Sequence, residues 1–137
     1  MRNRKNILIV DDSKIEQVML RSKLQKEGYT VYTAETVSEG LAVLGMEDVG
    51  IVLVDFYLAG YNNGAAMVKK IRRYRVDVLI YAISSSQDTS RELLDSGCDG
   101  ILSKNPSEIV EFLLGQNSSA QDISPSTHQP CRHLPKG

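Results

Sequence analysis

Short apolar runs alternate with stretches of helical periodicity along most of this chain. Five runs predict β-strands at Asn6–Val10, Thr30–Ala34, Ile51–Asp55, Val78–Ile83 and Gly100–Ser103. The third run is apolar at every position before its aspartate, as is typical of a strand covered by helices on both faces. The alternation therefore predicts an α/β protein with a doubly wound, five-stranded parallel sheet and five helices in three α/β/α layers.

The stretches between these runs carry helix start and stop signals. Ser13 and Glu16 are spaced as a capping box before the first helix, and Gly28 is a natural stop for it. We expect the inner face of this helix to consist of Ile15, Val18, Met19 and Leu24. Three later helices have an apolar stripe of their own, formed by Val37, Leu41 and Leu44, by Met67, Val68 and Ile71, and by Ile109, Phe112 and Leu113.

The bounds of the later helices follow from similar signals. The second helix should begin near Thr36 and end at Gly45. The polar, glycine-containing segment Ala59–Gly64 predicts a loop before the third helix, and the short fourth helix should end at Gly97. The fifth helix should open at Asn105, with Pro106 in its first position and Glu108 completing a cap.

Length and charge exclude several classes of function. The chain has 137 residues, which suits one domain, and a net charge of −1, which excludes the basic footprint of a nucleic-acid-binding domain. We interpret Arg2, Arg4 and Lys5 as a solvated arm. The chain lacks both a secretory signal and an apolar stretch of the ~20 residues that a membrane span needs, so we expect a cytoplasmic protein.

The character of the chain changes after Gly115. Residues 116–137 are rich in Ser, Gln and Pro, so we expect a folded domain over residues 1–115 and a disordered tail. Cys98 should be a small packed residue. Cys131 lies in the tail with His128 and His133, which are too few ligands for a closed zinc site.

Polar residues stand where the predicted strands end. Asp11 and Asp12 follow the first strand, Asp55 ends the third, Ser84 follows the fourth and Lys104 follows the fifth. We expect the strand order 2-1-3-4-5, in which the first and third strands are neighbours and the three aspartates converge at the carboxyl edge of the sheet. Unscreened carboxylates repel one another, so this group needs a cation, and a set of oxygen ligands favours Mg²⁺. A lysine and a hydroxyl beside them suit a phosphoryl group.

Taken together, these five positions resemble the receiver domains of two-component response regulators, which have a flavodoxin-like fold. The resemblance extends from about Asn6 to Gly115. It implies that Asp55 is the phosphoacceptor, which takes a phosphoryl group from the phosphohistidine of a sensor histidine kinase or a histidine phosphotransfer protein. It further implies that Ser84 hydrogen-bonds a phosphoryl oxygen and that Lys104 pairs with Asp55 or its phosphate.

The resemblance also implies the cofactor and the manner of signalling. Mg²⁺ would be bound by Asp12 and Asp55, by Asp11 mostly through water, and by the backbone carbonyl of Tyr57. The chain would be a signalling phosphoacceptor that assists its own phosphorylation and dephosphorylation, rather than an enzyme. It would act through protein–protein contact, without binding nucleic acid or inserting into a membrane. Its downstream target, and whether it forms a homodimer, stay open.

The chain departs from the family pattern at four places. Ile101 stands where the family usually has an aromatic residue that turns inward on phosphorylation. The segment between Ser84 and Lys104 is shorter than usual, and the loop before Gly64 is longer. The family's Lys-Pro becomes Lys104-Asn105-Pro106, and we predict a trans Lys104–Asn105 bond because a cis bond there would cost ~2.5–4 kcal/mol.

One further hypothesis and several alternatives remain. Tyr57 and Ser86 would flank the approach of water in the family's arrangement, so a bulky Tyr57 would slow hydrolysis of the acyl phosphate. Asp11 or Asp12 alone could simply cap a helix. Other classes on this fold are a pseudo-receiver, which would lack the acidic set, a haloacid-dehalogenase-type phosphatase, which would need an aspartate at position 57, and a flavodoxin-like FMN carrier, whose phosphate Asp11 and Asp12 would repel.

Overall fold

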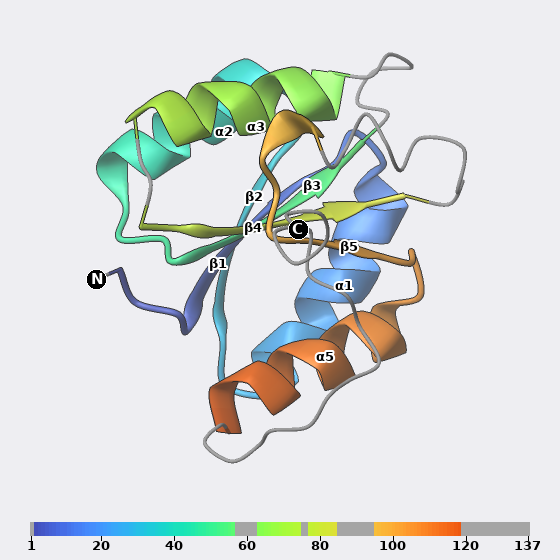
Figure 1. The fold of residues 1–137 in the computed structure, drawn as a ribbon. Coiled ribbons are helices and arrows are strands. Elements are labelled where there is room, and N and C mark those ends of the chain that lie inside the picture. The colour runs from blue at the N-terminus through green and yellow to red at the C-terminus, as the bar shows by residue number, and fades with distance from the viewer. Residues whose placement is uncertain (1, 57–62, 75–76, 85–94, 119–137) are drawn as a thin grey trace.

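A parallel sheet of five strands forms the centre of the computed structural model, which describes residues 2–56, 63–74, 77–84 and 95–118 (Figure 1). The strands are β1 (Asn6–Val10), β2 (Thr30–Ala34), β3 (Ile51–Asp55), β4 (Leu79–Ile83) and β5 (Gly100–Leu102). Their order is β2-β1-β3-β4-β5 and every neighbouring pair is parallel. The predicted topology is confirmed, and the first three strands have the predicted bounds.

Helices cover both faces of this sheet. The described helices are α1 (Lys14–Lys26), α2 (Val37–Met46), α3 (Asn63–Tyr74) and α5 (Pro106–Ser118). Figure 1 shows α2 and α3 on one face and α1 and α5 on the other. The predicted three-layer arrangement is confirmed, whereas the predicted fourth helix falls mainly on residues outside the described ranges.

Alternation along the strands divides the core in two. One cluster faces α2 and α3 and includes Leu8, Val10, Val52, Val54, Leu44, Met67, Val68 and Ile71. The other faces α1 and α5 and includes Ile7, Ile9, Ile51, Leu53, Leu20, Leu24, Ile109 and Leu113. Because both faces of β3 are covered, all five of its residues are buried, as its unbroken apolar run predicted.

The helix ends follow the predicted signals closely. The Ser13 hydroxyl accepts a hydrogen bond from the Glu16 N–H at 3.3 Å, and Gly28 follows α1 with a φ of +93°, which favours glycine. Thr36 caps α2 as expected, but this helix ends at Met46, one residue past the predicted Gly45. Helix α5 continues to Ser118, past the predicted start of the tail.

The inner face of α1 differs from the prediction. Leu24 is buried, as predicted, but Ile15, Val18 and Met19 are 73%, 49% and 49% exposed, and Gln17 and Leu20 are buried in their place. The side-chain amide of Gln17 donates hydrogen bonds to the carbonyl oxygens of Asp11 (2.5 Å) and Ala34 (2.9 Å). A polar side chain that is satisfied in this way can be buried, and its position turns the apolar residues before Leu20 toward solvent.

The amino-terminal arm also differs from the prediction, because Arg2 is not simply solvated. Its guanidinium donates to the carbonyl oxygens of Leu44, Glu47 and Val49, where α2 ends and the chain turns toward β3. A Cβ on Gly50 would collide with the backbone of Asn3, so this glycine allows the arm to lie close to the chain before β3. Arg2 therefore satisfies carbonyl groups at the end of α2.

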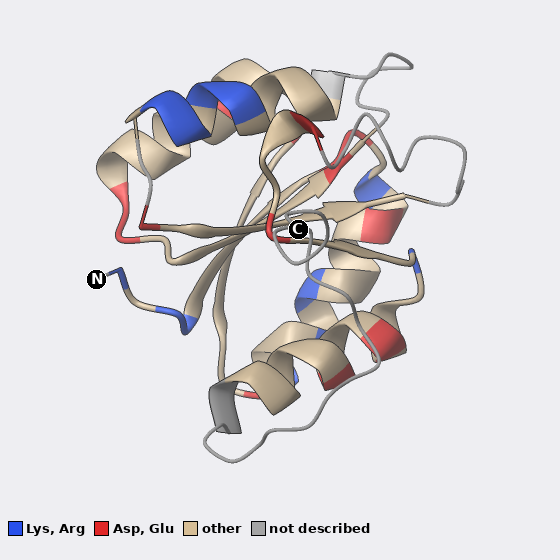
Figure 2. Cartoon of the chain, viewed as in Figure 1, with Lys and Arg blue, Asp and Glu red and all other residues tan. Residues whose placement is uncertain are grey.

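The charge of the domain is distributed over both faces of the sheet. Figure 2 shows basic residues along α3 and acidic residues along α5, in line with a net charge of −1.

Among the described residues, every helix is too short or too polar to cross a bilayer. Cys98 is buried, as predicted. The predictions for the loop residues 59–62 and for Cys131, His128 and His133 in the tail fall outside the described residues.

Candidate functional site

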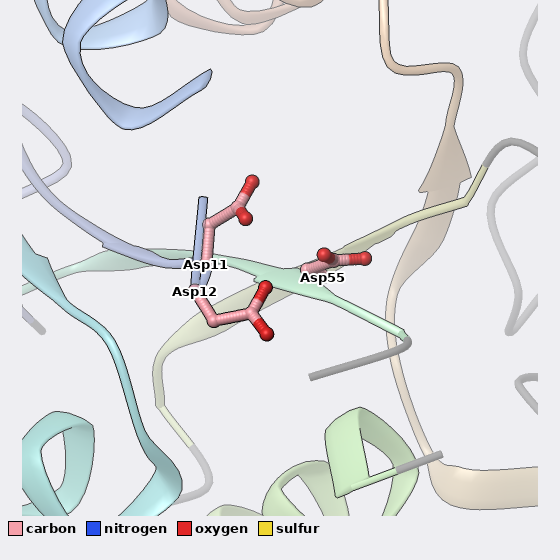
Figure 3. A group of neighbouring side chains, drawn as sticks. All are labelled: Asp11, Asp12 and Asp55. Atoms are coloured by element: carbon pink, nitrogen blue, oxygen red, sulfur yellow. The ribbon is translucent and has the colours of Figure 1, made fainter. Parts of the chain in front are cut away.

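Three carboxylates meet where β1 and β3 end at the same edge of the sheet. These strands are paired so that Val10 lies opposite Val54, which places Asp11 beside Asp55. One side-chain oxygen from each of Asp11, Asp12 and Asp55 lies within 4.8 Å of the others (Figure 3). Asp11 and Asp55 are only 7% and 5% exposed, whereas Asp12 is exposed. The predicted convergence of the three aspartates is confirmed.

Burial makes this acidic group unfavourable without a counter-charge. Burial, with a smaller contribution from the charge of Asp55, raises the pKa of Asp11 to about 7, although the Ser13 N–H donates to its Oδ1 at 2.9 Å and opposes the shift. Three oxygen ligands within reach of one another suit a hard divalent cation. The chemistry of the donor set therefore fits Mg²⁺.

Lys104 brings a positive charge to the same edge. Its Nζ lies 3.4 Å from Asp55 Oδ2 and 2.8 Å from Glu16 Oε1, so it bridges the end of β3 and the first turn of α1. Burial lowers the pKa of Lys104, but the hydrogen bond to Glu16 and the charges of Asp55 and Asp11 outweigh burial and leave this pKa above its ordinary value. Lys104 is therefore a cation at the pH of the cell.

Ser84 is placed next to Asp55 by the pairing of β3 with β4. Asp55 lies opposite Ile83, and Ser84 comes directly after Ile83. The Ser84 N–H donates to the Leu102 carbonyl at 3.1 Å, which joins the end of β4 to β5. Ser84 is buried, as are Asp11 and Asp55. The backbone thus brings all the described candidates, from four different strands, to one edge of the sheet.

Gly64 allows α3 to begin against the backbone of the site. A Cβ at this position would lie 2.5 Å from the Asp55 carbonyl oxygen and 2.7 Å from the Phe56 Cα. The Gly64 N–H donates to the Phe56 carbonyl at 3.1 Å. Only a residue without a side chain fits this close approach. The helix that follows therefore holds the chain at Asp55 in place.

A comparison with known protein families shows to which family this chain belongs. A model of the response regulator receiver domain matches residues 7–113, which is more than half of the chain. The chain belongs to this family. The matched range contains every site residue described above. The sequence motifs alone suggested a resemblance to receiver domains, and the family match confirms it.

Individual relatives agree with this assignment. The receiver is 29% identical over 100 residues to the KDP operon transcriptional regulatory protein KdpE of Escherichia coli K12, covering 72% of this chain and 44% of the relative. It is also similar to a solved CheY-like receiver domain protein of Methanospirillum hungatei JF-1, with a TM-score of 0.74, 29% identity and coverage of 83% and 94% of the two chains. The chain spans less than half the length of KdpE.

Two more distant solved structures share the fold. One is a Burkholderia pseudomallei response regulator with a phosphorylated aspartic acid, calcium ion and citrate (TM-score 0.69, 22% identity, 85% and 74% coverage). The other is the receiver domain of Ssk1 in complex with the histidine phosphotransfer protein Ypd1 of Saccharomyces cerevisiae (TM-score 0.73, 24% identity, 84% and 90% coverage).

The departures of this receiver from the family pattern can be placed in part. Described residues contain no cis peptide, so the Lys104–Asn105 bond is trans, as predicted. The Asn105 side chain accepts hydrogen bonds from the N–H groups of Ser107 (2.9 Å) and Glu108 (3.2 Å) and so caps α5. Ile101 is partly buried against the core cluster on the α2 and α3 face. Tyr57 and Ser86 lie outside the described residues, so the hypothesis about water access stays a prediction.

Sequence patterns missed two residues of this site. Glu16 was expected only as part of a capping box, yet its carboxylate pairs with Lys104. Gln17 was not singled out, yet it holds the Asp11 and Ala34 carbonyl groups. The spacing of Gln17 to Leu20 and Leu24, three and seven residues on, could have revealed it as part of the buried stripe.

Proposed function

We propose that this receiver domain accepts a phosphoryl group on Asp55 from the phosphohistidine of a sensor histidine kinase or a histidine phosphotransfer protein, with Mg²⁺ as cofactor. The observation that carries the proposal is the convergence of the Asp11, Asp12 and Asp55 oxygens within 4.8 Å, with Lys104 Nζ 3.4 Å from Asp55. A phosphorylated aspartate and a calcium ion in a structure of the same fold support it. The signal would pass on through protein–protein contact.

The side chains at the edge of the sheet have distinct roles in this proposal. An Asp55 oxygen attacks the phosphorus, the bond from phosphorus to the donor's imidazole nitrogen breaks, and that nitrogen keeps the electron pair. Ser84 donates a hydrogen bond to one phosphoryl oxygen, and Lys104 pairs with another. Lys104 Nζ already lies 3.4 Å from Asp55 Oδ2, so only a short movement is needed for it to reach a phosphoryl oxygen.

Asp12 and Asp55 would bind Mg²⁺ directly and Asp11 mostly through water, as the resemblance implies. The Tyr57 carbonyl, the remaining expected ligand, lies outside the described residues. When bound, the ion offsets the charge of the three carboxylates and of the incoming phosphoryl group. Without it, the burial of Asp11 and Asp55 places two acidic groups together in a poorly hydrated position.

The donor would dock over the exposed apolar residues of α1. Ile15, Val18 and Met19 form a patch, spaced three and four residues apart, that begins four residues after Asp11. A protein that presents a phosphohistidine to Asp55 must cover this edge of the sheet, so the patch lies within its footprint. The complex of a receiver of the same fold with a histidine phosphotransfer protein supports a partner of this kind.

Intact-mass measurement tests the phosphoacceptor directly. Incubation with acetyl phosphate and Mg²⁺ should add one phosphate to the wild-type chain and none to Asp55→Asn. Asp48→Asn is the matched control, because Asp48 is exposed and precedes the opposite end of the same strand, β3. An adduct that persists in Asp55→Asn contradicts the proposed acceptor. Absence of an adduct with acetyl phosphate, phosphoramidate and a phosphorylated phosphotransfer protein would instead identify a pseudo-receiver.

A further inference from the structure

Glu16 is an additional acidic residue at the edge of the phosphoacceptor site. It lies in the first turn of α1, and its Oε1 is 2.8 Å from Lys104 Nζ, closer than Asp55 Oδ2 at 3.4 Å. The two residues are separated by 88 positions in the sequence, so the pair joins α1 to the end of β5. In this arrangement Lys104 is held toward α1 rather than wholly toward Asp55.

The carboxylate of Glu16 is available for this pair because Asp11 replaces it in the helix cap. In a complete capping box the glutamate would accept a hydrogen bond from the N–H of Ser13, but that N–H donates to Asp11 Oδ1 at 2.9 Å. Glu39 holds the equivalent position in α2, and its carboxylate turns back toward its own helix start, where it accepts from the N–H of Glu35, the residue before the cap Thr36, at 2.8 Å. The contrast shows that α1 places its glutamate at the site instead of at its own cap.

The pair changes the charge environment of both partners. The hydrogen bond from Lys104 lowers the pKa of Glu16, so Glu16 is an anion at neutral pH. The Lys104 side chain is 30% exposed and that of Glu16 is 47% exposed, so the pair is partly solvated and can open at a modest cost. A phosphoryl group on Asp55 would present oxygens with more negative charge than the carboxylate has, and would attract the same ammonium group.

We propose that Glu16 is a positioning residue that competes with the phosphoryl group on Asp55 for Lys104 and thereby favours the unphosphorylated arrangement of the site. The inference rests on the proposed function. Phosphorylation transfers Lys104 from Glu16 to the phosphoryl oxygens, and Glu16 is then released to solvent beside Ile15. Removing the Glu16 carboxylate should therefore favour the phosphorylated arrangement without altering the acceptor.

Binding of beryllofluoride, a non-covalent mimic of a phosphoryl group, tests this competition by isothermal titration at saturating Mg²⁺. Glu16→Gln should bind it roughly three- to fivefold more tightly than the wild type, which is the range for loss of one partly exposed ion pair. Glu35→Gln is the matched control: it removes the same charge directly after β2, but from the pair with Lys14 at 2.6 Å. It should leave the affinity within about twofold of the wild type.

The ε-methylene NMR signal of Lys104 gives a readout independent of affinity. In the unbound protein this signal should move on Glu16→Gln, and in the wild type it should move on addition of beryllofluoride. Equal tightening by Glu16→Gln and Glu35→Gln would reduce the effect to overall charge and overturn the inference. An unchanged Lys104 signal in unbound Glu16→Gln would also overturn it. Absence of beryllofluoride binding in the wild type has a different meaning, because it contradicts the proposed phosphoacceptor itself.

Discussion

At the scale of single residues, Asp11 shows how the fold prepares the site for a cation. Its backbone carbonyl accepts from Gln17, its Oδ1 accepts from the Ser13 N–H, and its side chain is buried beside Asp55. These contacts keep the carboxyl group in place although its pKa is raised to about 7. The metal-free protein therefore carries a proton at this position in acidic solution, and a bound cation must displace it.

The raised pKa of Asp11 predicts two effects of pH with a defined sign. One pH unit below 7, Mg²⁺ affinity measured by titration calorimetry should be about tenfold weaker than its value at alkaline pH, since the ion competes with the proton. Between the ordinary value of 3.8 and about 7, Asp11 binds more protons in the metal-free folded chain than in the unfolded chain. The contribution of Asp11 to the free energy of unfolding should therefore decrease as pH rises through that window.

Asp11→Asn is the control for the stability effect. Denaturant unfolding in EDTA should show the wild type losing stability relative to Asp11→Asn as pH rises from about 4 to about 8. A constant difference between the two proteins over this range would show that Asp11 titrates at its ordinary value and would contradict the assigned burial effect.

Gly64 gives a second prediction at this scale. Gly64→Ala places a methyl group 2.5 Å from the Asp55 carbonyl oxygen, so the chain at Asp55 or the start of α3 must shift. We expect a loss of about 1–3 kcal/mol in the free energy of unfolding and weaker Mg²⁺ binding. Gly45→Ala is the matched control, because Gly45 lies inside α2 and a Cβ there meets nothing within 4 Å.

The control should behave in the opposite way. Alanine is a better helix former than glycine, so Gly45→Ala should stabilise the domain by up to about 1 kcal/mol and leave Mg²⁺ binding unchanged. Equal unfolding free energies and equal Mg²⁺ affinities for Gly64→Ala and the wild type would show that the backbone at Asp55 accommodates the methyl group freely.

At the scale of elements, α1 separates structural and binding functions onto two faces. Gln17, Leu20 and Leu24 pack against the sheet, whereas Ile15, Val18 and Met19 face solvent. An apolar face on a helix that does not pack against its own domain is typical of a surface that binds a partner. Its start beside Asp11 and Asp12 places this surface at the edge of the sheet where we propose that phosphorylation occurs.

A charge in this patch should impair docking of the phosphodonor protein and leave the reactivity of Asp55 intact. Ile15→Glu should slow phosphoryl transfer from a phosphorylated histidine phosphotransfer protein by about tenfold or more, since it puts an unpaired charge into the contact. Phosphorylation by acetyl phosphate, which needs no docking surface, should stay within about twofold of the wild type. Single-turnover transfer followed by intact mass measures both rates.

Met46→Glu is the matched control for the docking surface. Met46 is 74% exposed and Ile15 is 73% exposed, but Met46 lies at the end of α2 on the other face of the sheet. Transfer should be unaffected by Met46→Glu. Equal slowing by both substitutions would show a general effect of charge, and normal transfer in Ile15→Glu would place the donor elsewhere.

Local patterns predicted the elements of this domain better than they predicted side-chain partners. The strands and the stripe Met67, Val68 and Ile71 follow from apolar spacing alone, because these residues contact the core through regular geometry. The prediction of the inner face of α1 was right for Leu24 and otherwise wrong. Gln17 is buried there through hydrogen bonds to carbonyl groups at the ends of two strands, and its polarity gave no sign of this burial. The Glu16–Lys104 pair and the contacts of Arg2 join distant parts of the chain, so no spacing rule could reveal them.

At the scale of the whole molecule, the two ends of the sheet differ in how their charged side chains are balanced. The carboxyl ends of the strands collect Asp11, Asp12 and Asp55 with one nearby lysine, an arrangement that leaves an excess of negative charge for a cation. The other end has a satisfied pair, in which Arg72 of α3 contacts Asp99, just before β5, at 2.5 Å. The carboxyl end of the sheet therefore has an excess of negative charge, whereas at the opposite end an acidic side chain is paired with a basic one.

The Arg72–Asp99 pair should contribute to the stability of the domain without affecting phosphorylation. Arg72 also donates to the carbonyl groups of Val78 (2.8 Å) and Gly97 (2.9 Å), and Asp99 Oδ2 accepts from the Ile80 N–H at 2.9 Å. The Arg72 and Asp99 side chains are 23% and 10% exposed, so Asp99→Asn leaves a largely buried guanidinium without its counter-charge. We expect denaturant unfolding to show a loss of about 2–4 kcal/mol.

The exposed ion pair between Lys14 and Glu35 supplies the control for this last prediction. Its side chains are 75% and 39% exposed, so water already screens their attraction and Glu35→Gln should leave the free energy of unfolding nearly unchanged. The acetyl phosphate reaction should proceed at the wild-type rate in Asp99→Asn at a temperature where that variant is folded, because Asp99 lies at the opposite end of the sheet from Asp55. A slowed reaction in the folded variant would mean that the network around Arg72 influences the phosphoacceptor edge through β4, and the two ends of the sheet would then be coupled rather than independent.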